Sequence, residues 1–195
     1  MAIDFSQVNT ITIPEGSVKK ITDSTGVVIW KEKPNNWHTI WEGNKTCSVK
    51  VNGSSTPVIT GSENNFAQTV SGTGYTPKIR ITFSYSRTNN SPSSYENAFI
   101  VNNSWKYSNE ADQTSPITIE SVYDSTNSAN LCAPACDHIG SDTAYGYAGI
   151  RKKRDTENNR IIFNMYPNVS SNITSYNGNF IITFTVTKIE QYIDN

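Results

Sequence analysis

The fold of this chain is decided by the stretch Lys78-Ile79-Arg80-Ile81-Thr82-Phe83-Ser84-Tyr85. Apolar and polar side chains alternate along it, so an extended backbone would bury one face and expose the other. The same alternation covers residues 178–192, a stretch long enough for a central strand of a sheet. Both stretches predict a β-sheet with one buried face.

Extended segments are also expected on both sides of this stretch. They cover residues 37–42, 45–51, 66–70, 95–101, 117–123, 145–153 and 160–165. Gly43-Asn44 suits a tight hairpin between the first two segments. Residues 102–115 are polar and predict a long loop, while residues 129–136 predict one short helix that Pro134 limits. Many strands joined by polar connections predict an all-β antiparallel β-sandwich, jelly-roll-like in type.

A small β-hairpin module is expected at the N-terminus. The charged, proline-containing run at 31–36 predicts a linker between a module of residues 1–33 and a sandwich of residues 34–195. Such a module buries too little apolar surface to fold alone, so it must lie against the rest of the chain or another protein. We expect its apolar side chains to form an assembly interface: Ile11, Ile13, Val18, Ile21, Val28 and Trp30.

The same module carries a resemblance to a known class of proteins. From Ile11 to Trp30 it reads I-x-I-P-E-G-x-V-x-x-I-x-D-x-x-G-x-V-x-W. This pattern is similar to the N-terminal segments of structural proteins of tailed bacteriophages, namely tail, fibre and surface-appendage proteins of gut-phage type. Residues 37–43 resemble the opening strand of the β-domains behind such segments. The resemblance covers about a fifth of the chain and implies a virion component, without carrying over any catalytic residue.

Composition and charge exclude several classes of function. A formal net charge of -1 lacks the basic excess that nucleic-acid binding needs. No stretch reaches the ~18 apolar residues of a membrane-spanning helix, and Met1 to Asp4 lacks the features of a signal peptide. We therefore expect no nucleic acid, no membrane insertion and, for a virion component, assembly in the host cytoplasm.

One segment, Cys132 to His138, has metal-ligand residue types. Cys132, Cys136 and His138 would supply three of the four ligands that Zn²⁺ prefers, and Cys47 would have to supply the fourth. The spacing is not C-x₂-C and no second pair exists, which favours two small semi-buried hydrophobes on a turn. No metal or other cofactor is expected. A Cys132–Cys136 disulfide stays open, although cytoplasmic assembly favours free thiols.

Catalytic groups are sparse. The chain has two histidines and no G-x-S-x-G motif, so a nucleophilic triad is not expected. A glycosidase needs two carboxylates, which any two strands or loops can supply. The acidic residues placed in predicted loops are Asp112, Glu120, Asp124, Asp137 and Asp142. Nothing in the sequence selects two of them, and we predict that the protein is not an enzyme.

The run Arg151-Lys152-Lys153-Arg154 is basic but is followed by Asp155 and Glu157. A solvated strand end is the favoured interpretation of this run. Binding of phosphate or lipopolysaccharide is the alternative, because a local basic patch can hold an anion.

Aromatic residues are the better functional signal. Aromatic faces stack on sugar rings, and neighbouring polar groups then bind the hydroxyls. Trp37 and Trp41 share one face of a strand at period two and are expected in a core or interface. The candidate ligand-binding residues are Trp105, Tyr107, Tyr145 and Tyr147.

These observations predict a non-enzymatic phage virion structural protein. Its N-terminal module would attach it to other virion proteins, and its sandwich would decorate the particle or bind a host-surface glycan, as a receptor-binding protein does. Such appendages form symmetric homo-oligomers, for example trimers. The alternative is a stand-alone carbohydrate-binding module or a small glycan-active enzyme.

Overall fold

The computed structural model divides the chain into two compact units, Met1–Asn35 and Asn36–Asn195. The division lies within the expected linker, two residues after the expected module boundary at 33. The structure describes residues 20–22, 25, 28–31, 37–53, 55–62, 65–71, 78–90, 95–107, 113–120, 129–138, 144–155, 157–158, 160–173 and 178–192.

The first unit contains one antiparallel hairpin. Strand β1 (Lys20–Thr22) pairs with β2 (Val28–Lys31), with Ile21 opposite Trp30. This hairpin lies within the N-terminal β-hairpin module that the sequence predicted. Of the six expected interface residues, Ile21, Val28 and Trp30 lie on these strands, while Ile11, Ile13 and Val18 lie outside the described residues.

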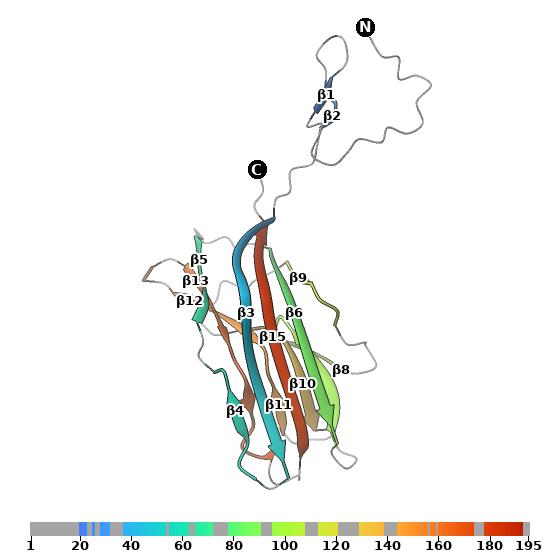
Figure 1. The fold of residues 1–195 in the computed structure, drawn as a ribbon, viewed down its shortest axis with the longest axis vertical. Coiled ribbons are helices and arrows are strands. Elements are labelled where there is room, and N and C mark those ends of the chain that lie inside the picture. Colours follow the sequence, from blue (N-terminus) through green and yellow to red (C-terminus); the bar gives the residue numbers. More distant parts are fainter. Residues whose placement is uncertain are drawn as a thin grey trace, which may run out of the picture. The chain divides into compact units, whose positions relative to one another are not determined.

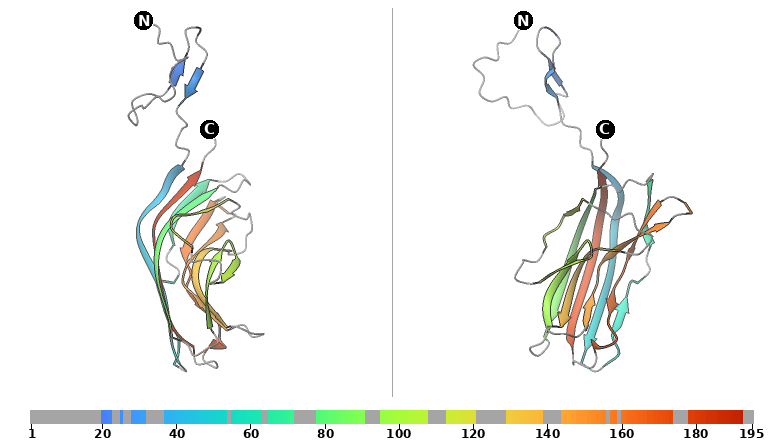
Figure 2. Two further views of the ribbon diagram at one scale, coloured as in Figure 1. Left: turned by 90° about the vertical axis from the view of Figure 1, so that its right-hand side faces the viewer. Right: turned by 180° about the vertical axis from the view of Figure 1, so that it is seen from behind.

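The second unit is a sandwich of two antiparallel sheets, which confirms the all-β sandwich prediction (Figures 1 and 2). The five-stranded sheet has the order β4 (Val58–Thr60), β3 (Trp37–Asn52), β15 (Asn179–Tyr192), β6 (Ile79–Asn89) and β9 (Ile117–Ile119). The first and last long strands, β3 and β15, are neighbours at its centre. No helix long and apolar enough to cross a membrane occurs in the described ranges.

The eight-stranded sheet covers one face of the five-stranded sheet. Its path runs β14 (Asn168–Val169), β11 (Tyr145–Tyr147), β10 (Ala129–His138), β12 (Ile150–Asp155), β13 (Arg160–Met165) and β5 (Asn65–Ser71). Strand β7 (Tyr95–Val101) pairs with β10 and with β8 (Ser104–Tyr107).

The core lies between the two sheets and follows the alternation of the sequence. On β6, Ile79, Ile81 and Phe83 are buried, and on β15 Phe180 and Phe184 point into the same core. The eight-stranded sheet contributes, among others, Phe99, Cys132, Cys136, Ile150, Phe163 and Met165. Because alternate side chains of the central strands β6 and β15 enter this core, the intervening side chains of these strands lie on the outer face of the sheet.

The prediction of a hairpin at Gly43-Asn44 is wrong. Residues 37–52 form one long strand, and Glu42 and Lys45 on either side of the expected turn pair with Lys188 and Val186 of β15. The physical reason is the length of the partner, because β15 offers backbone hydrogen-bonding groups along almost all of β3.

The prediction of a helix at residues 129–136 is also wrong. These residues belong to β10, which pairs with β7 on one edge and with β12 and then β11 on the other. Pro134 falls between the residues that pair with β12 and those that pair with β11. A proline lacks the N–H that a continuous ladder needs, so this break is where a central strand tolerates it.

The long polar loop expected at 102–115 begins instead with a tight hairpin. Asn102 and Asn103 both have positive φ, 47° and 64°, and join β7 to β8 with Val101 opposite Ser104. Two central residues of positive φ define the type I′ turn, and asparagine tolerates this region better than other side chains. Trp105 and Tyr107 therefore lie on a strand.

Candidate binding face

The outer face of the eight-stranded sheet gathers five aromatic rings, which we call the aromatic face: Trp105, Tyr107, Tyr145, Tyr147 and Tyr166. Their placement follows from strand register. Phe99 of β7 points into the core, so Ala98 and Ile100 point outward. Tyr107 pairs with Ala98 and Trp105 with Ile100, which places both rings on this outer side.

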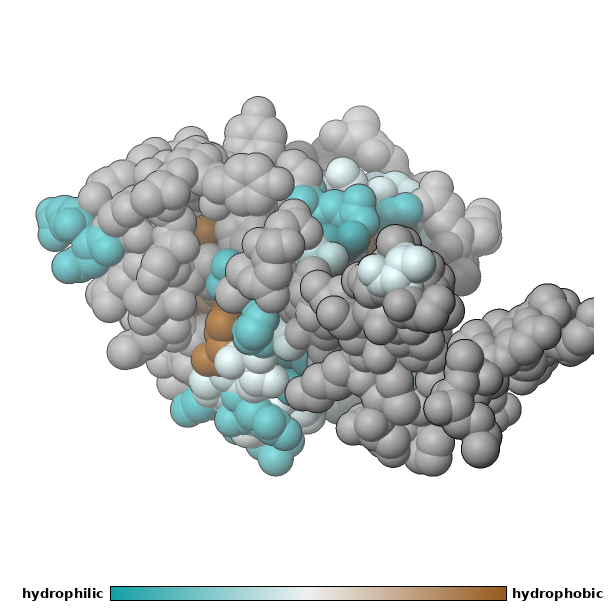
Figure 3. All heavy atoms as spheres, turned by 90° about the horizontal axis from the view of Figure 1, so that it is seen from above, coloured by the Kyte–Doolittle hydropathy of each residue, from teal (hydrophilic) through white to brown (hydrophobic). Residues whose placement is uncertain are grey.

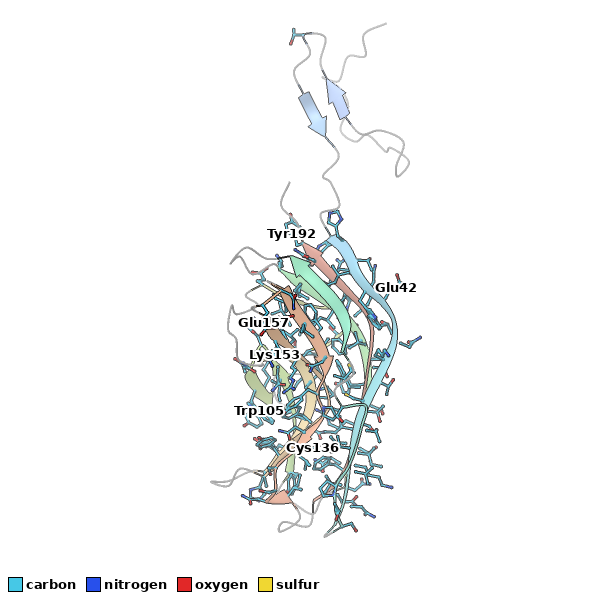
Figure 4. The ribbon with its side chains drawn as sticks, turned by 90° about the vertical axis from the view of Figure 1, so that its left-hand side faces the viewer. Glu42, Trp105, Cys136, Lys153, Glu157 and Tyr192 are labelled. Carbon is cyan, nitrogen blue, oxygen red and sulfur yellow. The ribbon has the colours of Figure 1, made fainter. Side chains whose placement is uncertain are left out.

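Strand β11 brings two more rings to the same side. Tyr147 lies opposite Ala135 of β10, and Tyr145 lies opposite Asp137. Figure 4 places Trp105 and Glu42 on opposite outer sides of the sandwich, with Cys136 between them. The four aromatic residues selected from the sequence therefore lie on one face, although they come from two separate hairpins.

Small side chains let the rings meet. Ala98, Ala133 and Ala135 are buried and form the floor of a second apolar cluster with Trp105 and Tyr145 packed against it. Above this floor, the ring of Trp105 meets Tyr145 edge-on at 5.6 Å and Tyr147 at 6.4 Å between centroids. These spacings are those of favourable aromatic pairs. Larger residues on β7 and β10 would keep the two hairpins' rings apart.

The fifth ring and a cation extend the face. Tyr147 contacts Tyr166, with centroids 6.0 Å apart, and the guanidinium carbon of Arg151 lies 3.6 Å from the centroid of the Tyr166 ring. The Nε atom of Arg151 donates to Oδ1 of Asn164 at 3.1 Å. Sequence reasoning missed Tyr166, although the alternation of the predicted strand at 160–165 puts the next position on the outer side.

Polar groups surround the rings. The Tyr107 hydroxyl donates to Oδ2 of Asp137 at 2.9 Å, and this bond raises the pKa of Tyr107. Asn130 Nδ2 donates to the hydroxyl of Tyr147 at 3.3 Å. Burial is the main cause of the raised pKa of Tyr147. Both phenols therefore stay neutral in ordinary buffers.

The rings differ in solvent exposure, so the buried rings support the face and the exposed rings are available to contact a ligand. Tyr147 is 5% exposed and acts as a floor, whereas Tyr107 is 41% exposed. Trp105, Tyr145 and Tyr166 are half-buried, so each presents part of its ring to solvent. A face with partly exposed rings and adjacent hydroxyl, amide and carboxylate groups is chemically suited to sugars.

Two carboxylates lie side by side at one end of this face. Glu96 of β7 is directly opposite Asp137 of β10, and both are half-buried. Asp137 accepts hydrogen bonds at both oxygens, from the Tyr107 hydroxyl and from the backbone N–H of His138. Both oxygens of Asp137 are therefore engaged by groups of the chain itself.

Other acidic candidates do not join this group. Glu120 forms an ion pair with Lys78 at 2.6 Å, and Lys78 lies on the strand edge beside β6 rather than on the aromatic face. Asp112, Asp124 and Asp142 lie outside the described residues.

The cysteine segment does not form a metal site. Cys132, Cys136 and His138 share one side of a strand, where residues four apart are separated by about 13 Å. That separation is too large for one ion or for a disulfide. All three cysteines are buried and free, and among the described residues no group of three His, Cys, Asp or Glu side chains could hold a metal.

The two N-terminal tryptophans of the sandwich do not share a face. A bulge in the β3–β15 pairing shifts the register between Ile189 and Glu190. Trp41 consequently packs against the core, whereas Trp37 covers Arg80, with 4.5 Å between the guanidinium and the ring.

Figure 3, which views the molecule from above, shows the described residues there as mostly hydrophilic, with small apolar areas.

The basic run is split between two faces. Lys152 is buried, at 1% exposure, and Arg151 and Lys153 alternate with it on the outer side of β12. The side chain of Arg154 lies outside the described part of the chain. The run therefore contributes Arg151 to the edge of the aromatic face, with Lys153 next to it on the same strand side.

Comparisons with protein-family models, with the curated proteins and with the solved structures find no match to this chain. Its function must therefore be argued from its own residues.

Proposed function

We propose that this chain is a non-enzymatic structural protein of a tailed-bacteriophage virion that binds a host-surface glycan through the aromatic face of its sandwich. The N-terminal module attaches it to other virion proteins, and the sandwich is displayed. The observation that carries the binding role is the convergence of Trp105, Tyr107, Tyr145, Tyr147 and Tyr166 on one sheet face. The resemblance of residues 11–30 supports the virion role.

Sugar binding is supported by the chemistry of the face. Pyranose rings have apolar C–H faces that stack on aromatic rings, and their hydroxyls need donors and acceptors. The face offers half-exposed rings beside the carboxylate of Asp137 and the amide of Asn130. Single sites of this kind are weak, and an oligomeric appendage gains strength by engaging several glycans at once.

The binding role is tested by exposing the full chain to an array of bacterial and animal oligosaccharides. Tyr145→Ala removes a half-exposed ring without touching the main core, and we expect about tenfold weaker binding, equivalent to about 1.4 kcal/mol. Ile181→Ala, on the outer face of the other sheet where Ile181 is 43% exposed, is the matched control. Equal binding by wild type and Tyr145→Ala would contradict the proposal.

The attachment role is supported by the separation of residues 1–35 as their own unit. Size-exclusion chromatography with light scattering compares the full chain with a chain beginning at Asn35. We expect the full chain to form an oligomer and the shorter chain to remain a folded monomer. Two monomers would instead mean that the module completes the fold without mediating assembly.

A small glycan-active enzyme is the second candidate, and the pairing of Glu96 with Asp137 favours it. Glycosidases use two neighbouring carboxylates, one of which must donate a proton. Both oxygens of Asp137 already accept hydrogen bonds, from the Tyr107 hydroxyl and the His138 N–H, which leaves Glu96 as the candidate donor. A reducing-sugar assay on the glycans that bind decides the point, because release that disappears in Glu96→Gln would establish the enzyme.

A further inference from the structure

Arg151 has an unusual setting for a surface arginine. Its guanidinium lies over the Tyr166 ring, with 3.6 Å between Cζ and the ring centroid, and its Nε atom donates to Oδ1 of Asn164 at 3.1 Å. These two contacts fix the plane of the group while Arg151 remains half-buried. A stacked guanidinium presents its remaining N–H groups in its own plane, which is the geometry that binds a carboxylate or phosphate through two parallel hydrogen bonds.

No carboxylate of the described residues forms an ion pair with Arg151. Lys78–Glu120, Arg80–Glu190 and Lys188–Glu190 are ion pairs on the other sheet. Lys153, which is exposed, follows on the same side of β12 and adds a second positive charge. Asp155 comes next on that side and accepts hydrogen bonds from Asn158, so this end of the aromatic face holds two cations, Arg151 and Lys153, and one carboxylate.

The opposite end is negatively charged. Glu96 and Asp137 lie there, and Asp137 is seven residues along β10 from Asn130, which pairs with Arg151. Seven residues of strand span about 20 Å. A contact series of Trp105, Tyr145, Tyr147 and Tyr166 connects the two ends. The face consequently has a direction, and an anionic group is favoured at one end only.

We infer that the aromatic face selects an acidic glycan, whose anionic substituent is bound by Arg151, held over Tyr166, while its sugar rings stack along Tyr145 and Trp105. This inference rests on the proposed glycan-binding function and adds its ligand class. The substituent is an oxyanion, either the carboxylate of a uronic or sialic acid or a phosphate ester. The carboxylates at the far end repel a second anion, so a glycan with one acidic end fits best.

The test is a titration of the full chain with matched acidic and neutral sugars at low and high salt. The pairs are sialyllactose with lactose, and oligogalacturonate with its methyl ester; mannose 6-phosphate with mannose separates a phosphate ester from a carboxylate. We expect an acidic member to bind about tenfold more tightly than its neutral partner at low salt, and this preference to shrink at high salt.

Variants assign the preference to a residue. Arg151→Gln should remove the preference and leave binding of the neutral member unchanged. Lys50→Gln on the outer side of β3 makes the same change of charge on the other sheet and should preserve the preference. If Arg151→Gln fails to fold, the wild type alone tests the inference, because its preference for the acidic sugar should shrink at high salt.

Each remaining outcome is distinct. Equal binding of acidic and neutral sugars overturns the inference while the proposed function stands. If the wild-type chain binds none of the sugars, both the inference and the proposed glycan-binding function are overturned. Inorganic phosphate is added as a competitor. If it displaces the acidic sugar as effectively as a free acidic sugar does, Arg151 is a simple anion site and the inference is overturned as well.

Discussion

Trp105 of β8 meets Tyr145 of β11 edge-on, with 5.6 Å between ring centroids, although strands β7 and β10 lie between them in the sheet. The contact crosses these strands because Ala98, Ala133 and Ala135 leave the space above them open. The pair therefore holds the β7–β8 hairpin against the sheet and also forms the centre of the aromatic face.

Trp105→Ala should lower the free energy of unfolding by about 2 kcal/mol, because a half-buried indole loses its contacts with Tyr145 and Tyr147. Urea denaturation measures the loss, and hydrogen exchange should show early opening of residues 104–107. Val58→Ala is the control, since Val58 is 54% exposed and its truncation should cost no more than about 0.5 kcal/mol. Similar losses for both variants would show that Trp105 does not hold the hairpin.

Glu190→Gln should destabilise the fold by about 2 kcal/mol, because Glu190 is 6% exposed and accepts two hydrogen bonds from Arg80 at 2.8 and 3.0 Å. Removing the negative charge leaves Arg80 unpaired beneath Trp37. Glu120→Gln is the matched control, since its ion pair with Lys78 is exposed and should contribute nothing measurable. Equal behaviour of the two variants in urea would contradict the prediction.

The same pair makes stability depend on pH. Hydrogen bonding from Arg80, followed by that from Lys188, holds the pKa of Glu190 below its ordinary value. A lowered folded-state pKa adds stability that is complete above the unfolded pKa of about 4.3 and disappears as pH falls through the folded value. The difference in unfolding free energy between wild type and Glu190→Gln should therefore shrink between pH 5 and acid denaturation. If this difference stays constant or grows as the pH falls, the Glu190–Arg80 pair is not the source of the pH dependence.

Gly149→Ala should destabilise strongly, by about 3 kcal/mol, because an added Cβ would collide with Ala133 and with the carbonyl oxygen of Cys132. Gly53→Ala is the comparison, since Gly53 has φ of 58° and open space around its Cα. Only backbone strain opposes that substitution, at about 1 kcal/mol. Urea midpoints in the reverse order would mean that the packing of β10 against residues 148–150 is looser than the structure has it.

The three thiols should be unreactive in the folded protein. Cys47, Cys132 and Cys136 are buried, and burial raises the pKa of Cys47 and of Cys136 to about 12. Since the thiolate is the reactive form, Ellman's reagent at pH 8 should label none in native buffer and three in denaturant. Only one reactive thiol after denaturation would reveal a disulfide, and fast labelling of the native protein would contradict the burial of these strands.

Part of the candidate face was predictable from the sequence. Trp105, Tyr107, Tyr145 and Tyr147 were selected because aromatic rings near predicted loops and strand ends suit sugar contact. The structure brings these four together. Trp105 and Tyr107 nevertheless lie on β8, since an Asn-Asn turn of positive φ forms a hairpin where polar composition suggested a loop.

Other residues of the face could not be predicted. Arg151 reads as one member of a basic run, and Ala133 and Ala135 read as part of a helix. Their roles depend on which strand lies beside them, and strand neighbours far apart in sequence leave no local signal. The same holds for β10, because pairing on both edges overrides the helical preference of alanine.

By itself, the sequence determined the all-β class, the long strands at 79–89 and 179–192 and the faces that those two strands bury. These features follow from the period-two alternation of side chains, which is a local property of an extended backbone. Only the tertiary structure decided that β3 runs unbroken beside β15, that a bulge turns Trp37 away from the face of Trp41, and that two hairpins share one aromatic face. Register and strand order depend on non-local hydrogen bonds and packing, so they are settled only when the whole sheet forms.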